Sequence, residues 1–140
     1  MKILPVTLGL CLLSLTALPD INIKLDVGGD GNKERRLELL RSIRIATREL
    51  KDVFVVDNLV LPDLNISMSL TEQQENQNDP IVIAITVLVL DPTSGKLLGA
   101  ITSLGYWRTY KKNVQFIINY LDETPFQNLR DKQRQQHQNK

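Results

Sequence analysis

The sequence predicts an α+β protein in which a mostly antiparallel sheet of about four to five strands packs against two helices. Several segments alternate apolar and polar residues with a period of two, which is typical of half-buried strands. Two other segments repeat apolar residues at helical spacing. Aromatic residues make up only 5% of the chain, so aliphatic side chains must fill the core. The expected order is β-α-β-β-β-β-α within one domain, residues 19–125.

The first 18 residues are expected to be a signal peptide. Lys2 is followed by an uncharged segment, residues 3–18, which is shorter than the roughly 20 residues of a membrane-spanning helix. A buried N-terminal strand or helix is the alternative, but the abrupt change to polar sequence at Asp20 argues against it. We therefore expect export to the periplasm or to the medium, with the segment either cleaved or kept as an anchor.

Cys11 is the only cysteine and lies inside this apolar segment. The residue before it, Leu10, is larger than a bacterial lipoprotein signal requires, so lipidation is not expected. Cleavage would leave a chain without cysteine, which excludes disulfides and thiolate metal sites. We expect no metal and no cofactor.

The first structured segments are a strand and a charged helix. Apolar and polar residues alternate over residues 21–27, and a glycine-rich turn follows at residues 28–32. A helix is predicted over residues 33–51 because Leu39, Ile43, Ala46 and Leu50 form one apolar stripe.

Three arginines, Arg41, Arg44 and Arg48, lie on the polar side of this helix. They are candidates for a surface that binds an anion or a protein partner. An ordinary solvated helix surface is the preferred interpretation, because helical spacing alone places the arginines side by side and glutamates are interspersed among them.

Four more strands are predicted. They cover residues 53–56, 64–71, 81–90 and 97–107. The segment 81–90 is almost continuously apolar, which is typical of a central strand covered on both faces, or on one face and by a partner. Gly99 and Gly105 indicate a bulge, a bend or the close approach of a neighbour.

Tyr106 and Trp107 lie at the end of the last strand. We expect them to cap the core, and an exposed ligand platform is the alternative.

A second helix is predicted over residues 109–123, with Pro125 ending it. The tail, residues 126–140, has four basic residues and one acidic residue, and its low apolar content predicts disorder or a frayed helix. Such a tail allows contact with an anionic membrane.

Three segments carry a resemblance to a known family: VFVVD (53–57), LNISMSL (64–70) and IVIAITVLVLDPTSGKLLGAITS (81–103). In the last, a long strand, an Asp-x-x-x-Gly turn and a strand that begins with Leu and Gly resemble the N-terminal domain of TolB and the related CsgG and LpoB proteins. The likeness covers residues 21–124. Within these 140 residues there is no propeller domain, which TolB has, and no lipobox cysteine, which the lipoprotein relatives have. The resemblance implies protein binding in the cell envelope without catalysis.

The remaining composition excludes several functions. His137, the only histidine, lies in the polar tail, so no packed scaffold is expected to hold a catalytic or metal-binding histidine. The chain has 17 basic and 16 acidic residues, without the basic excess of a nucleic-acid-binding protein. We therefore expect a non-catalytic envelope module that binds proteins. The alternative is a carrier of a small ligand or lipid in a pocket between sheet and helices. An exposed strand edge would also allow a homodimer.

Overall fold

The computed structural model describes residues 19–57 and 60–140. Its elements are β1 (Ile21–Gly28), α1 (Lys33–Arg48), β2 (Val53–Val55), β3 (Leu64–Gln73), β4 (Val82–Leu90), β5 (Leu97–Tyr106), α2 (Tyr110–Leu121) and α3 (Gln127–Gln138). The predicted α+β class and the order of strands and helices are confirmed as far as α2. The predicted signal peptide, residues 1–18, lies outside the described residues.

The sheet has five strands in the order β2-β1-β3-β4-β5. It is mixed: the longer pairings are antiparallel, as predicted, and two parallel pairings join them. β1 pairs in parallel with both β2 and β3, whereas β3, β4 and β5 form an antiparallel meander. The parallel half arises because the chain crosses over the sheet through α1 before β2 and β3 are laid on either side of β1.

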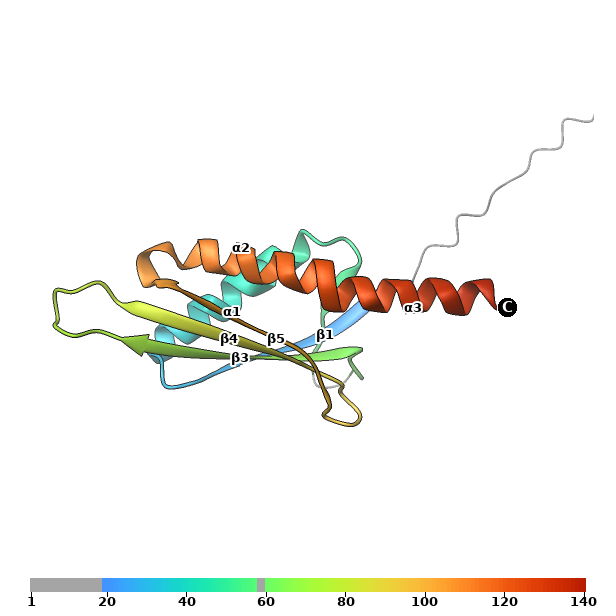
Figure 1. The fold of residues 1–140 in the computed structure, drawn as a ribbon, viewed down its shortest axis with the longest axis horizontal. Helices are drawn as coiled ribbons and strands as arrows, with labels where there is room; N and C mark the ends of the chain where they lie inside the picture. The colour runs from blue at the N-terminus through green and yellow to red at the C-terminus, as the bar shows by residue number, and fades with distance from the viewer. Residues whose placement is uncertain (1–18, 58–59) are drawn as a thin grey trace, which may run out of the picture.

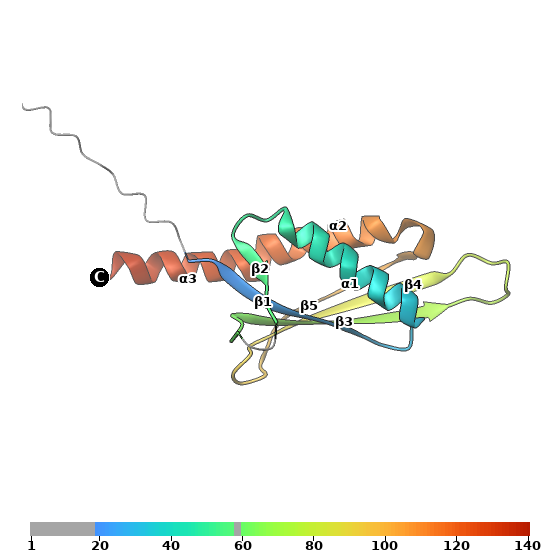
Figure 2. The same ribbon diagram turned by 180° about the vertical axis from the view of Figure 1, so that it is seen from behind.

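Both α1 and α2 cover the same face of the sheet, as the two opposite views show (Figures 1 and 2). Alternate residues of β1, β3 and β4 point into this layer and are buried, among them Ile23, Ile66 and Ile85. The core is completed from the helices by side chains such as Ile43 and Ile117. The predicted period-two strands and the apolar stripes therefore meet in one layer between sheet and helices.

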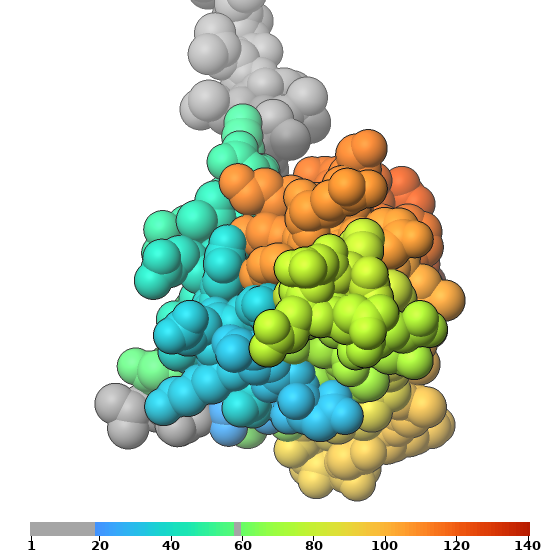
Figure 3. Space-filling model, turned by 90° about the vertical axis from the view of Figure 1, so that its left-hand side faces the viewer, coloured from blue at the N-terminus to red at the C-terminus, as the bar shows by residue number. Residues whose placement is uncertain are grey.

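Seen from the end that carries the β3–β4 connection, α1 (cyan) lies beside α2 (orange), and the β4–β5 turn (yellow) lies on the side away from α2 (Figure 3). Next to the β4–β5 turn, the pairing of β4 with β5 is irregular, because the register shifts between Val89 and Leu90.

Gly99 and Gly105 bring β5 against α2. A Cβ at Gly99 would lie 2.7 Å from the hydroxyl oxygen of Tyr120, and one at Gly105 would lie 2.8 Å from Oδ1 of Asn113. Of the three predicted alternatives, the structure shows a close approach at both glycines, with α2 as the neighbour, and a register irregularity next to Gly99. Because Asn113 lies near Gly105 and Tyr120 lies near Gly99, α2 runs antiparallel to β5.

Pro125 does not end the second helix, which corrects that prediction. The chain passes through a π-helical turn, Asp122–Phe126, that contains the proline, and then continues as α3. A π turn relieves the clash that a proline ring makes with the carbonyl four residues earlier in a regular helix. The side chain of Phe126 is fully buried at this point.

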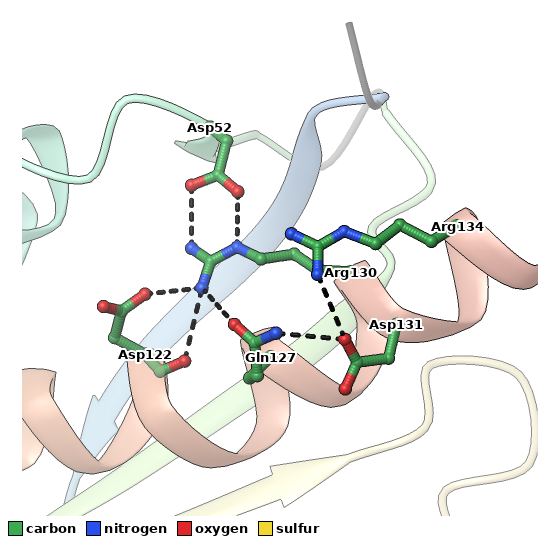
Figure 4. A network of polar contacts seen from close by, with 6 residues as sticks. All are labelled: Asp52, Asp122, Gln127, Arg130, Asp131 and Arg134. Atoms are coloured by element: carbon green, nitrogen blue, oxygen red, sulfur yellow. Dashed lines mark hydrogen bonds and ion pairs between the residues drawn. The ribbon is translucent and has the colours of Figure 1, made fainter.

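The tail is helical, so of the two predicted states, disorder or a helix, the structure shows a helix. Arg130 ties α3 to the body of the protein (Figure 4). Its Nε and one terminal nitrogen donate to the two carboxylate oxygens of Asp52 at 2.6 and 2.8 Å, and its other terminal nitrogen lies 2.8 Å from Asp122. Arg134 also pairs with Asp131 at 3.6 Å. Two of the four basic residues of the tail are therefore ion-paired, and contact of the tail with a membrane stays a prediction.

None of the helices formed by residues 19–57 and 60–140 has the length and hydropathy needed to cross a membrane.

Candidate protein-interaction surface

The sheet face opposite the helices, here named the open face, is left uncovered by the described elements (Figures 1 and 2). On β1 and β3 this face carries polar side chains, such as Lys24, Asp26, Ser67 and Thr71. These residues are the polar partners in the alternating pattern of their strands. This half of the open face therefore has the polar composition of a solvent-exposed surface.

The other half of the open face, on β4 and β5, is mostly apolar, and one polar pair interrupts it: the hydroxyls of Thr86 and Thr102 lie 3.2 Å apart. We name it the apolar strip; its members are Val82, Ala84, Leu88, Ala100, Leu104 and Tyr106. Pairing in register places Val82 beside Tyr106, Ala84 beside Leu104 and Leu88 beside Ala100. Leu104 is 74% exposed, Tyr106 45% and Val82 43%. Adjoining exposed apolar side chains on neighbouring strands mark a surface that a partner covers.

β5 is also an open edge of the sheet. The backbone N–H of Trp107 donates to the carbonyl of Ile81 at 2.9 Å, just beyond the last paired residues of β4 and β5. Because residues of an antiparallel pair alternate between bonding to the neighbour and pointing away, Tyr106, Leu104 and Thr102 direct their backbone groups outward. The Asn113 amide donates to one of these groups, the Leu104 carbonyl, at 3.0 Å.

The sequence of β5, LLGAITSLGY, contains no charged residue and no proline. Charges and prolines are the usual means by which an edge strand avoids pairing with another chain. Because β5 has neither charges nor prolines, its outward backbone donors and acceptors can pair with a further strand.

A groove of about 530 Å³ follows this edge on the helix side. Thr102 and Leu104 of β5 form one wall, and Lys112 and Phe116 of α2 form the other. Phe116 is 51% exposed. The β5 edge thus offers backbone hydrogen bonds flanked by an apolar side chain on each face of the sheet.

Tyr106 and Trp107 do not form a common platform. The Tyr106 side chain belongs to the open face, and Trp107 lies on the helix side, packed against the core. The Trp107 ring stacks on Tyr110 with centroids 4.3 Å apart, and the Arg35 guanidinium lies 5.8 Å from its centroid. Trp107 is therefore held against the core by other side chains, as in the predicted core cap. Tyr106 is 45% exposed, and the Arg108 guanidinium lies 5.6 Å from its ring centroid.

Tyr110 also links the two helices. Its hydroxyl donates to Glu38 of α1 at 2.9 Å and lies 3.0 Å from the hydroxyl of Ser42. Burial is the main cause that raises the pKa of Tyr110. A hydroxyl that stays protonated keeps this link through the neutral pH range.

The structure places Arg41, Arg44 and Arg48 together on the exposed side of α1, where they line one shallow hollow with Leu37 and Ile45. Arg44 and Arg48 also line a cleft of about 410 Å³ between the end of α1 and β2. Arg44 and Arg48 thus lie beside β2, and none of the three arginines lines the groove beside β5. Whether they bind a partner stays a prediction.

The sequence did not identify Val82, Leu88, Leu104 or Phe116 as surface residues. Segment 81–90 and the segment around Leu97–Leu98 are too continuously apolar for alternation to show which residues face the helices. The only local signal is the absence of charge along residues 97–106. Among residues 19–57 and 60–140, no group of three or more His, Cys, Asp or Glu side chains is placed to hold a metal ion.

These observations define a class of protein: a small α+β domain whose mixed sheet is covered by two helices on one face and open on the other. No protein-family model matches the sequence, and none of the curated proteins does. Solved structures do share the fold.

The PelC protein of Paraburkholderia phytofirmans, described as a dodecamer, is 14% identical with a TM-score of 0.51, over 75% of this chain and 86% of that chain. Protein XCC0632 of Xanthomonas campestris, from family DUF330, is 9% identical with a TM-score of 0.52, over 86% of this chain and 92% of that chain. TolB of Acinetobacter baumannii is 6% identical with a TM-score of 0.50, over 76% of this chain and 29% of that chain. The predicted likeness to TolB is confirmed for the fold, and the likeness to CsgG and LpoB stays a prediction.

Proposed function

We propose that this protein is a non-catalytic protein-interaction or assembly module of the bacterial cell envelope. The apolar strip on β4 and β5 is the observation that carries the proposal. It places exposed leucine, valine and tyrosine side chains on a rigid, paired part of the sheet, where a partner can bury them without reordering the domain.

β4 supports the proposal in a second way. It is hydrogen-bonded on both edges and buried on its helix face, but its other face, with Val82 and Leu88, is exposed. β4 thus has the almost continuously apolar sequence that is typical of a strand covered on both faces, but the helices cover only one face of its sheet. A protein partner would complete the burial for which this sequence is suited.

The envelope location is supported by the predicted signal peptide and by the fold shared with TolB. The PelC protein, described as a dodecamer, shows that a domain of this fold can assemble with others. Both statements concern other proteins, and they support the proposal for this chain only through the shared fold. The carrier of a small ligand or lipid stays the alternative, in which case a bound molecule would be extracted from the purified protein.

The test is crosslinking in the native cell followed by recovery of the tagged protein. A Leu88→Lys chain should lose at least about 90% of its crosslinked envelope partner, because the charge added to the strip must be desolvated on binding. The matched control is Leu61→Lys, which adds the same charge to an exposed apolar residue outside the apolar strip and outside the hollow of the three arginines, and which should recover the partner as the wild type does.

Equal recovery of partner by the Leu88→Lys and wild-type chains would contradict the proposal. Circular dichroism of both variants establishes that each is folded, so that lost binding is not lost structure.

A further inference from the structure

We propose that the β5 edge binds an extended segment of a partner protein as an added strand, antiparallel to β5, with an acidic side chain of that segment beside Lys112. The inference rests on the proposed interaction role and names the kind of partner that the edge fits. Three features of the edge carry it: its outward backbone groups, the position of α2, and the side chains of the groove.

The backbone groups of β5 define where the added strand lies. Ala100, Thr102 and Leu104 direct their N–H and C=O groups away from β4, so each can exchange two hydrogen bonds with the residue opposite it. The Leu104 carbonyl, which accepts from the Asn113 amide at 3.0 Å, has a second lone pair for this bond. An antiparallel strand continues the order of β3, β4 and β5. The opposite edge of the sheet, β2, has only three residues.

The position of α2 restricts the partner to a strand that brings no helix on this face. α2 lies over β5, and a strand paired with β5 would lie about 4.8 Å away. Packed helices need about 8–10 Å between their axes, so a second copy that paired through its own β5 would collide with α2. A single extended segment does not collide, because the groove of about 530 Å³ leaves the space beside β5 open. A flexible loop, linker or terminus of an envelope protein has this form.

Alternation places the side chains of the added strand on two surfaces. The residues opposite Thr102 and Leu104 would lie on the open face and extend the apolar strip, which favours apolar side chains there. The residues opposite Ser103 and Gly105 would lie on the helix side and enter the groove. In such a complex the backbone gives affinity, and the alternate side chains in the groove give specificity.

The groove is suited to one apolar and one acidic side chain. Because α2 runs antiparallel to β5, Phe116 lies level with Ser103, and Lys112 lies nearer to Gly105. Phe116 is 51% exposed, and Lys112 is the one charged side chain among the described residues that line the groove. In the part of the chain that the structure describes, no ion pair involves Lys112. An acidic side chain opposite Gly105 would therefore pair with Lys112, and an apolar one opposite Ser103 would cover Phe116.

A synthetic peptide tests this pairing directly. The probe is fluorescein-labelled Ser-Val-Glu-Val-Leu-Val-Thr-Ser, in which the glutamate lies opposite Gly105 and the leucine lies opposite Ser103. The valines then take the positions on the open face. The purified full chain should bind the probe, and fluorescence polarisation measures the dissociation constant.

N-methylation of the probe separates strand pairing from apolar contact. The valines opposite Thr102 and Leu104 donate their N–H groups to β5, so methyl groups on these two nitrogens should raise the dissociation constant about tenfold or more. The glutamate and leucine N–H groups point away from β5. Methyl groups on those nitrogens should change the dissociation constant by less than about twofold.

Reversal of charge tests the chemistry of the partner. Lys112→Glu should raise the dissociation constant of the probe about fivefold, because two carboxylates then meet. A probe in which lysine replaces the glutamate should bind this variant as tightly as the original probe binds the wild type. Lys111→Glu is the matched control, since Lys111 does not line the groove, and its dissociation constant should equal that of the wild type.

A variant of β5 tests the edge itself. Thr102→Pro removes an outward N–H that makes no bond to β4, so the sheet should keep its circular dichroism spectrum while the probe no longer binds. A wild type that does not bind the probe, the opposite pattern of N-methylation, or equal binding by the Lys112→Glu and wild-type chains would each overturn the inference. A chain that fails to bind the probe but recovers an envelope partner would overturn this inference alone. A chain that binds the probe but recovers no envelope partner would contradict the proposed function alone.

Discussion

At the scale of single residues, contacts between β5 and α2 fix how the second helix sits on the sheet. The Asn113 side chain is buried, and its amide donates to the Ser103 hydroxyl at 2.7 Å and to the Leu104 carbonyl at 3.0 Å. It fits because Gly105 has no side chain. The same contacts place Lys112 and Phe116 beside the β5 edge.

A double-mutant cycle tests this arrangement by urea unfolding. Asn113→Ala should lower the free energy of unfolding by about 1–2 kcal/mol, because the two bonds of a buried amide are lost. Gly105→Ala should lower it by about 1–3 kcal/mol, because the new methyl group collides with that amide. The double variant should lose about 1 kcal/mol less than the sum, since the methyl group then has room. Strict additivity would show that Asn113 and Gly105 are not coupled.

At the scale of elements, the Arg130–Asp52 pair joins α3 to the turn before β2 (Figure 4). The two residues are 78 positions apart. The hydrogen bond from Arg130 is the main cause that holds the pKa of Asp52 below its ordinary value of 3.8. In turn, that hydrogen bond raises the pKa of Arg130. The pair stays charged at neutral pH and keeps α3 in line with α2.

The lowered pKa of Asp52 predicts the sign of a pH effect. A carboxyl group with a lower pKa in the folded state adds stability above its unfolded pKa, and that stability is lost as the pH falls through the folded value. Between about pH 5 and about pH 2, wild-type protein should therefore lose more free energy of unfolding than Asp52→Asn. The difference should be below about 1 kcal/mol, because the Asp52 side chain is 39% exposed.

Asp91 is the internal control for this measurement. Hydrogen bonds within its turn, first that from the Ser94 backbone, also lower its pKa. Its effect is the same in both chains and cancels in the difference. Identical pH profiles of wild type and Asp52→Asn would show that the ion pair does not stabilise the fold.

At the scale of the whole molecule, the hydrophobic core ends before the chain does. The buried residues extend from Ile21 to Phe126, and beyond Leu129, which packs on the core, the described side chains are mostly exposed. α3 projects past the end of the sheet (Figure 1). The sheet and its two covering helices form the cooperative unit.

A chain that ends at Arg130 should therefore keep a single unfolding transition. Its melting temperature should lie within about 5 °C of that of the full chain, because no buried apolar side chain is removed and the Asp52 pair is kept. Calorimetry of the two chains gives the measurement. A larger fall, or a second transition in the full chain, would show that residues 131–140 belong to the cooperative unit.

The sequence by itself determined the type of nearly every described element, because the period of apolar residues is a local property of neighbouring side chains. It also marked Gly99 and Gly105 as irregular positions of the strand, with close approach as one of three alternatives. Tertiary structure decided the rest. The parallel position of β1 between β2 and β3 depends on how α1 crosses the sheet, and the open face of β4 depends on which side the helices cover.

The candidate surface likewise lies beyond local pattern. The Arg130–Asp52 pair joins residues 78 positions apart, so the residues around either one do not predict the pairing. Leu104 and Phe116 are exposed because no other described element packs over them. The periodicity of their own strand and helix does not determine this. Local periodicity thus fixed the elements, while long-range packing decided which apolar side chains were left for a partner.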